Sequence, residues 1–228
     1  MKSIKKSLLF GVALGVLILV AMKTFNIDPE LVKKNYLWVA IAIIALVAGV
    51  NLGYNIVYMN KMKKLMPLFS QKRYKDFVIE VDKLLQRAKG KYLRTVLKIN
   101  QSSAYINLDE LKKAENLLKS IDINEYKADD IKIIYWINLC TLKYNKKNFK
   151  EFRKCYEEGK ETFEKFKDNP YYRENIMRIE MNSKAVDKKF DEAQGILDTL
   201  KEEYKQEELQ EEYKKLQNTL DKMKQEGK

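Results

Sequence analysis

The residue types that most often carry catalysis are scarce in this chain of 228 residues. Histidine is absent, which removes the commonest general base and every histidine-containing metal motif. The two cysteines, Cys140 and Cys155, do not form a Cys-x-x-Cys pair, so we expect buried free thiols. No glycine-rich phosphate loop occurs, because the four glycines beyond residue 60 are isolated from one another. The sequence therefore predicts no catalytic residue, no metal site and no cofactor, and a protein that is not an enzyme.

Two apolar stretches at the N-terminal end indicate a membrane anchor. Residues 7–23 and 36–59 are almost free of charge, and 23 helical residues reach about 35 Å against a hydrocarbon core of about 30 Å. We expect a hairpin of two transmembrane helices joined by a short outer loop, residues 24–35. The basic start of the chain also fits a cleaved signal peptide, although Leu19-Val20-Ala21 is a poor cleavage site.

Lysine placement predicts the orientation of this hairpin. Basic residues cluster in the N-terminal segment 1–6 and directly after the second stretch. The positive-inside rule then places both termini in the cytoplasm, on the inner membrane of a cell. The composition, rich in Lys, Asn and Ile, suggests a bacterium with an AT-rich genome.

Small residues in the two stretches favour close helix packing. Gly11 and Gly15 fall at matching depth to Gly53 and Gly49 in an antiparallel hairpin, where small residues let backbones approach. Asn51 and Asn55, one helical turn apart, would bond to a neighbouring helix near the cytoplasmic interface or line a polar path, and we favour the first interpretation. This pattern also allows a homo-oligomer.

The net charge of +12 is concentrated beside the anchor. Residues 61–100 carry 12 basic and 3 acidic side chains, whereas residues 101–228 are nearly balanced. Nucleic-acid recognition favours Arg, but only 6 of the 44 basic residues are Arg, so we expect no nucleic-acid partner. A basic segment next to a span attracts anionic headgroups by about 1 kcal/mol per charge. The candidate headgroup-contacting residues are Lys61, Lys63, Lys64, Lys72, Arg73 and Lys75.

Beyond residue 60 the chain predicts an all-α fold built from similar helix pairs. Four segments open on a large apolar residue and then place apolar or small residues at intervals of three or four, which forms one stripe on a helix. The openers are Tyr74, Leu111, Phe149 and Phe190. A further helix is expected before each of the last three, over residues 91–107, 128–145 and 171–187.

These paired helices resemble the tetratricopeptide repeat family. The resemblance rests on the large residue that opens the second helix (Leu111, Phe149, Phe190) and on the small residue three places later (Ala114, Ala193). It implies an α-solenoid over residues 91–207. Met181 at a tight position, Phe152 in place of the usual alanine and the missing proline after each unit depart from the family pattern. A plain helical bundle is the alternative.

The resemblance also implies a partner-binding groove along the first helices of the pairs. Amide side chains there could hydrogen-bond a peptide backbone, and an arginine could bind a carboxylate. The candidate groove residues are Asn100, Ser103, Asn107, Asn138, Thr141, Asn145, Arg178 and Asn182.

The sequence thus predicts a membrane-anchored, non-catalytic scaffold that binds a cytosolic protein or peptide. After the basic juxtamembrane segment and first helix (residues 60–90) and the repeats, residues 208–228 form a charged helix that caps the solenoid, or else a short coiled coil. The alternative function is an accessory or oligomerising subunit of a membrane complex.

Overall fold

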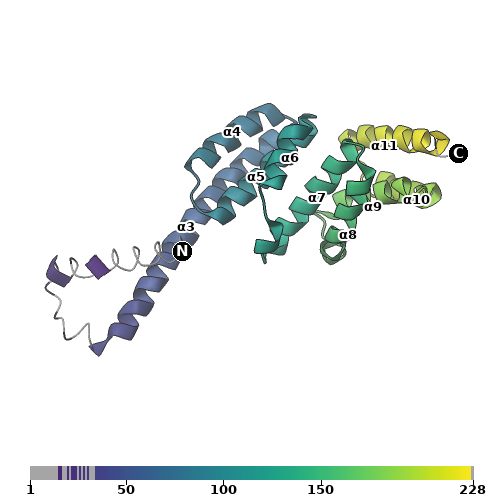
Figure 1. Cartoon of the computed structure of the whole chain (residues 1–228). Helices are drawn as coiled ribbons and strands as arrows, with labels where there is room; N and C mark the ends of the chain where they lie inside the picture. The colour runs from purple at the N-terminus through teal and green to yellow at the C-terminus, as the bar shows by residue number, and fades with distance from the viewer. Residues whose placement is uncertain are drawn as a thin grey trace. The chain divides into compact units, whose positions relative to one another are not determined.

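The computed structural model describes residues 34–226, together with residues 15, 16, 20, 22–24, 26, 28 and 30. From residue 36 to residue 226 the chain forms nine α-helices and one 3-10 helix, which confirms the predicted all-α class for this part. Two compact units are present, Met1–Val57 and Tyr58–Lys228. In chain order the elements are α3 (Tyr36–Ser70), α4 (Tyr74–Arg87), α5 (Lys91–Asn107), α6 (Leu111–Lys119), η1 (Ile123–Glu125), α7 (Asp129–Asn145), α8 (Phe149–Phe166), α9 (Arg173–Val186), α10 (Phe190–Glu203) and α11 (Glu207–Glu226) (Figure 1).

The first unit contains the apolar part of α3. This helix is long and apolar enough to cross a membrane, and its most apolar part is not buried. The side chains of Trp38 and Ile44 are 69% and 68% exposed. Apolar surface on this scale marks a membrane or protein contact rather than an ordinary solvated face. Among the described residues α3 is the one helix with these properties.

The expected transmembrane hairpin is not shown by the structure. Most of the first predicted span, residues 7–23, lies outside the described residues, as does Gly11. A Cβ atom added at Gly15, Gly49 or Gly53 would meet nothing within 4 Å among the described residues, so the expected close packing of these glycines is not seen there. The amide of Asn55 instead donates to Asn51 Oδ1 on the same helix, at 3.5 Å. One long apolar helix, not two, is therefore described.

Helix α3 passes through Pro67 and ends at Ser70. Proline removes one backbone hydrogen bond and its ring crowds the carbonyl four residues earlier, but α3 ends only three residues after Pro67, so little of the helix is affected. The last turn is closed by Lys72 N–H donating to Phe69 O and Arg73 N–H donating to Leu68 O.

With the end of α3 included, this helix-ending turn occurs four times in the second unit. At Lys147, for example, φ is 54°, its N–H donates to Tyr144 O at 2.8 Å, and Asn148 N–H donates to Lys143 O at 3.0 Å. This is a Schellman motif, which usually places glycine at the left-handed position. The four left-handed residues are Lys72, Asp109, Lys147 and Lys188. Two residues after each of them a new helix begins, at Tyr74, Leu111, Phe149 and Phe190, the four openers predicted from the sequence.

The helices of the second unit pack as sequential pairs. Helix α5 lies beside α6, α7 beside α8 and α9 beside α10, while α5, α7 and α9 also contact one another in order. The predicted apolar stripes form the core between them: Phe77, Val81, Ala114, Leu118, Phe152, Ala193, Leu197 and Leu200 are all buried. At Gly159 a Cβ atom would lie 2.9 Å from the Phe163 ring and 3.1 Å from Trp136, so glycine permits a close helix approach there.

One carboxylate ties α6 to α7. Glu115 Oε1 lies 3.0 Å from Lys143 Nζ, its other oxygen contacts Lys146, and Lys119 approaches within 3.2 Å. Hydrogen bonds from Lys146 and Lys143 lower the pKa of Glu115 from its usual 4.5 to about 2. Lys143 is itself buried, so removal of Glu115 would leave a buried ammonium without this ion pair.

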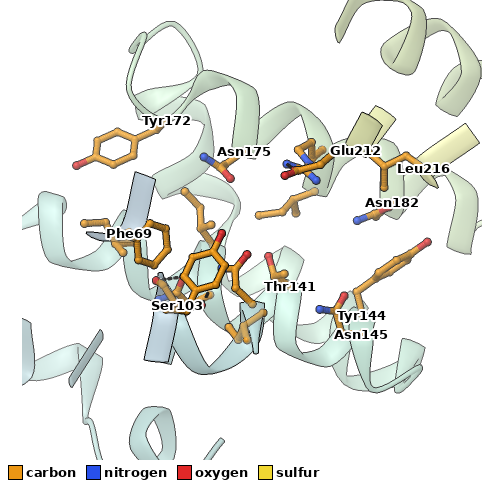
Figure 2. A pocket seen from close by; sticks show the side chains of 18 of the residues that line it. Phe69, Ser103, Thr141, Tyr144, Asn145, Tyr172, Asn175, Asn182, Glu212 and Leu216 are labelled. Carbon is orange, nitrogen blue, oxygen red and sulfur yellow. Dashed lines mark hydrogen bonds and ion pairs between the residues drawn. The ribbon is translucent and has the colours of Figure 1, made fainter. Parts of the chain in front are cut away.

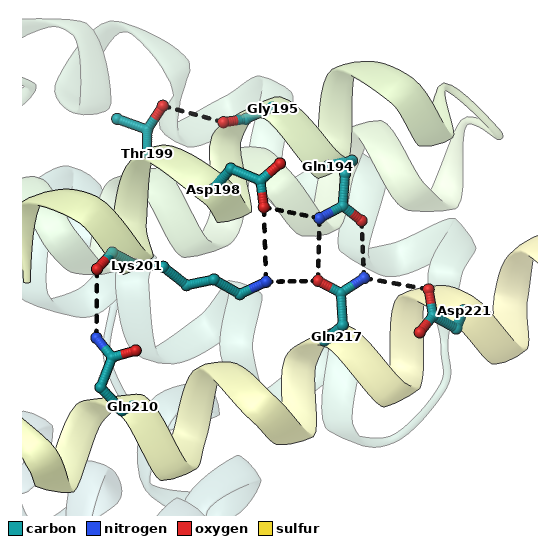
Figure 3. Close-up of polar contacts among 8 residues, drawn as sticks. All are labelled: Gln194, Gly195, Asp198, Thr199, Lys201, Gln210, Gln217 and Asp221. Atoms are coloured by element: carbon teal, nitrogen blue, oxygen red, sulfur yellow. Dashed lines mark hydrogen bonds and ion pairs between the residues drawn. The ribbon is translucent and has the colours of Figure 1, made fainter.

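The last helix, α11, covers the exposed side of α10. Tyr213 and Leu220 are 0% and 2% exposed and pack into the cluster that contains Leu197 and Leu200. The apolar stripe of this charged C-terminal helix is therefore buried against other helices of the same chain. Figure 3 shows the polar contacts that fix its register, in which Gln194 and Gln217 exchange amide hydrogen bonds of 2.9 and 2.7 Å.

Candidate functional site

A cavity of about 490 Å³ lies against the first helices of the three pairs, and we call it the central pocket. Its wall comes from α5, α7 and α9, with contributions from the end of α3, the start of α4 and the middle of α11. Figure 2 shows the amides of Asn145, Asn175 and Asn182 around it, with Phe69 and Tyr172 on one side. Its lining is dominated by neutral polar and aromatic side chains, with one arginine and one glutamate.

The structure brings seven of the eight predicted groove residues to this pocket. They are Ser103, Asn107, Asn138, Thr141, Asn145, Arg178 and Asn182. Asn100 does not line it, and its amide donates to the backbone oxygen of Val96 at 2.8 Å. Placement at the pocket does not test binding, so the role of these residues stays a prediction.

Asn138 holds two helices together. This side chain is 5% exposed, and its Nδ2 donates to Ile99 O at 2.9 Å and to Ser102 Oγ at 3.1 Å. Its Oδ1 accepts a hydrogen bond of 2.9 Å from Ser103 Oγ. All of these partners lie on α5, whereas Asn138 lies on α7. Its hydrogen-bonding groups are thus occupied inside the fold, which gives Asn138 and Ser103 a structural task.

Arg178 is likewise neutralised within the chain. Its Nη1 lies 3.2 Å from Glu174 Oε1 and 3.0 Å from Glu212 Oε2, and Lys72 approaches Glu212 at 3.6 Å. The Tyr213 hydroxyl also donates to Glu174, at 3.2 Å, and burial together with this carboxylate raises the pKa of Tyr213. An arginine so paired offers little to a partner's carboxylate, and the pocket is close to neutral.

Four amide or hydroxyl side chains of the pocket have unused hydrogen-bonding groups within the described residues. Thr141, Asn145 and Asn175 have no side-chain hydrogen bond within the described part of the chain, and the buried Oδ1 of Asn182 has no partner there. Asn107 donates only to the backbone oxygen of Ser103, one turn back on its own helix. A buried acceptor without a partner is uncommon, because leaving it unsatisfied costs about 1–3 kcal/mol.

The sequence interpretation missed more than half of the pocket wall. Asn175 shares the face of Arg178 and Asn182, three and seven residues earlier, so the helical period could have found it. The aromatic wall comes from Phe69, Tyr74, Tyr144, Tyr171 and Tyr172. Glu212 and Leu216 belong to α11, which returns to the pocket only through tertiary packing, and no local pattern signals that.

The predicted headgroup-contacting residues are on the surface of the second unit. All six of them, Lys61, Lys63, Lys64, Lys72, Arg73 and Lys75, are exposed. Lys61 Nζ lies 5.0 Å from the centre of the Tyr58 ring, and Arg73 pairs with Asp76 at 2.8 Å. The lysines at 63, 64 and 75 thus present their charge to whatever surrounds this segment.

The two cysteines are buried free thiols, as the sequence predicted. Burial raises the pKa of Cys140 well above its usual value and that of Cys155 to about 11. The nucleophilic thiolate is therefore disfavoured at neutral pH. Within the described residues, no three His, Cys, Asp or Glu side chains gather as a metal site.

No protein-family model matches the chain, and comparison with curated proteins and with solved structures finds no significant match. The tetratricopeptide resemblance therefore stays a prediction from the sequence.

Proposed function

We propose that this chain is a membrane-anchored scaffold that holds a segment of a cytosolic protein in the central pocket. The observation that carries the proposal is the set of unused amide and hydroxyl groups, Thr141, Asn145, Asn175 and Asn182, on two neighbouring first helices. Amides of this kind can pair with a peptide backbone whatever its side chains are. The scaffold acts by binding and performs no catalysis.

The partner segment is extended and carries no charge where it meets the pocket. The single arginine of the lining is already paired with two glutamates, so a charged partner group would find no unpaired opposite charge there. Aromatic rings of Tyr144, Tyr171 and Tyr172 offer apolar faces to the partner's side chains, and Tyr171 is 85% exposed. Large aromatic side chains of this kind are enriched where proteins bind one another.

The membrane anchor is part of this proposal. We infer that the exposed α3 helix and residues 7–23 span the inner membrane as a hairpin, with both termini in the cytoplasm. The exposed lysines that follow the span support this orientation and would contact anionic headgroups. Tetratricopeptide-like pairing of the later helices supports the scaffold role.

Site-specific photocrosslinking in cells tests the function. A photoreactive amino acid replaces Thr141 or Asn175, which line the central pocket, and in matched controls replaces Lys154 or Glu202, which are exposed on α8 and α10. We expect the pocket positions to capture one cytosolic protein that the control positions do not. Equal capture from both sets would contradict the proposal.

An accessory or oligomerising subunit is the second candidate. It is favoured by the bare face of α3, where Gly49 and Gly53 have nothing within 4 Å among the described residues. A detergent-resistant oligomer that is lost in Gly49→Leu but kept in the pocket variants would support this second function. Photocrosslinks from Thr141 or Asn175 that capture only subunits of a membrane complex would also support this second function.

A further inference from the structure

A second cavity, of about 700 Å³, lies where two helix-ending turns meet the C-terminal helix, and we call it the turn pocket. The turns are those at Lys147 and Lys188, and the end of α11 completes the wall. Tyr144 and Asn145 line this pocket and the central pocket alike, so the two cavities adjoin at the end of α7.

The turn pocket has an apolar floor. Phe149 and Phe190, which open the second helices of two consecutive pairs, face it together with Val186 and Met223. The residue four places before the opener is Asn107 in the first pair, Asn145 in the second and Val186 in the third. At the third pair the equivalent position thus changes from a polar amide to an apolar side chain, and the lining changes with it.

The rim of the turn pocket is cationic. Lys147, Lys188 and Lys222 line it, against one acidic residue, Glu226. Glu226 lies 3.8 Å from Lys222 on the same helix. Lys147 has no ion-pair partner within the described residues. A long-stemmed lysine can rest its methylenes on the apolar floor while its ammonium reaches a ligand.

We propose that the turn pocket binds an acidic segment of a partner protein that inserts one large apolar side chain between the lysines. An apolar cavity with a mainly cationic rim selects a ligand that combines a hydrophobic anchor with acidic groups. The central pocket, by contrast, is nearly neutral. The inference extends the proposed scaffold function: one segment runs from an uncharged stretch over the central pocket to an acidic, apolar-anchored stretch over the turn pocket.

The test uses the full chain in nanodiscs of phosphatidylcholine, which carry no net charge and so do not compete for the lysines. The probe is a fluorescein-labelled peptide with one tryptophan flanked by glutamates, and binding is followed by fluorescence anisotropy. The variant is Lys147→Glu/Lys222→Glu. The control, Lys112→Glu/Lys127→Glu, makes the same change in net charge at exposed lysines outside both pockets.

We expect the rim variant to bind the probe at least about tenfold more weakly, because two attractions become repulsions. The control should stay within about twofold of the wild type, as expected for exposed charges far from the contact. A peptide with serine in place of tryptophan should bind weakly to every form of the protein. A melting curve for each variant establishes that the fold is intact, and a rim variant that unfolds is replaced by Lys147→Gln/Lys222→Gln.

Equal weakening by both variants would mean that the probe follows the net charge, and the proposal would fail. Indifference to the loss of tryptophan would remove the apolar anchor and overturn it too. If Lys147→Glu/Lys222→Glu abolished the binding of phosphatidylserine vesicles but left peptide binding unchanged, the pocket would be assigned to lipid and the proposal would fail. Photocrosslinks from Thr141 and Asn175 report on the central pocket alone, so these failures are distinguishable from failure of the scaffold function.

Discussion

Replacement of Asn138 by leucine should destabilise the second unit strongly, although the sequence placed this residue among the partner contacts. The change keeps the side-chain volume roughly constant and removes the three hydrogen bonds to Ile99 O, Ser102 Oγ and Ser103 Oγ. Each such bond contributes about 1 kcal/mol net. Ile99 O keeps a bond of 2.7 Å from Ser102 Oγ, which limits the loss. We therefore expect a decrease of about 2–3 kcal/mol in the free energy of unfolding.

Asn145 provides the matched control on the same helix. It is exposed and has no side-chain hydrogen bond within the described residues, so Asn145→Leu should change stability by less than about 0.5 kcal/mol. The two substitutions remove the same chemical group from positions seven residues apart. Any difference between them therefore comes from the surroundings of the amide and not from asparagine itself.

Urea unfolding of the full chain in detergent micelles measures both changes. Trp136 lies on α7 and reports on the second unit, and a Trp38→Phe background removes the other tryptophan, which lies on the apolar part of α3. The reasoning would be refuted if Asn138→Leu unfolded at the wild-type urea concentration. A loss of partner photocrosslinks in Asn138→Leu with unchanged stability would show that Asn138 belongs to the binding surface after all.

Three further predictions concern stability. Gly159→Ala should lower the melting temperature of the full chain, because its Cβ would meet two aromatic rings. Gly195→Ala, at an open position of α10, should instead increase the free energy of unfolding by up to about 1 kcal/mol. Thermal melts followed by circular dichroism should therefore show shifts of the melting temperature in opposite directions. Lys147→Gly should stabilise by about 1 kcal/mol, because glycine adopts the left-handed turn without strain; a lower melting temperature would contradict it. The folded pKa of Glu115, about 2, lies below its usual 4.5, so the stability it contributes is complete above about pH 4.5 and is lost as the pH falls towards 2. Glu115→Gln should be less stable than the wild type at pH 7 and should differ little from it near pH 2, by thermal melts across this range.

Helix positions in the second unit were predictable because local chemistry sets them. The openers Leu111, Phe149 and Phe190 begin α6, α8 and α10 as the spacing indicated. Large apolar residues must be buried at fixed intervals, and this requirement is visible in a single chain. A tight turn before each opener was expected, but its left-handed residue was not, because lysine or aspartate occupies that position and neither residue signals the conformation as glycine does.

The central pocket was predictable only as far as single helices allow. Asn138 and Asn145 lie two turns apart on one face of α7, and their residue type is the same. Their roles differ because of their positions along α7. Asn138 contacts the middle of α5, whereas Asn145 is the last residue of α7 and lies beyond that contact. A periodic pattern gives the direction of a side chain but not the distance to its neighbouring helix, so the distinction needs tertiary structure.

Arginine and lysine also differ in how they are used: some lysines, such as Lys143, are paired within the fold, but others have no ion-pair partner among the described residues. The structure gives each of the six arginines an interaction partner, as in the pairing of Arg173 with Glu203 through bonds of 3.1 and 2.8 Å. The planar guanidinium suits such fixed contacts between helices. Lysines such as Lys63, Lys64 and Lys147 are exposed on the surface of the second unit. Because an ammonium is a compact point charge without a preferred plane, these surfaces suit ligands recognised by charge, and this is the property that the headgroup and acidic-segment proposals share.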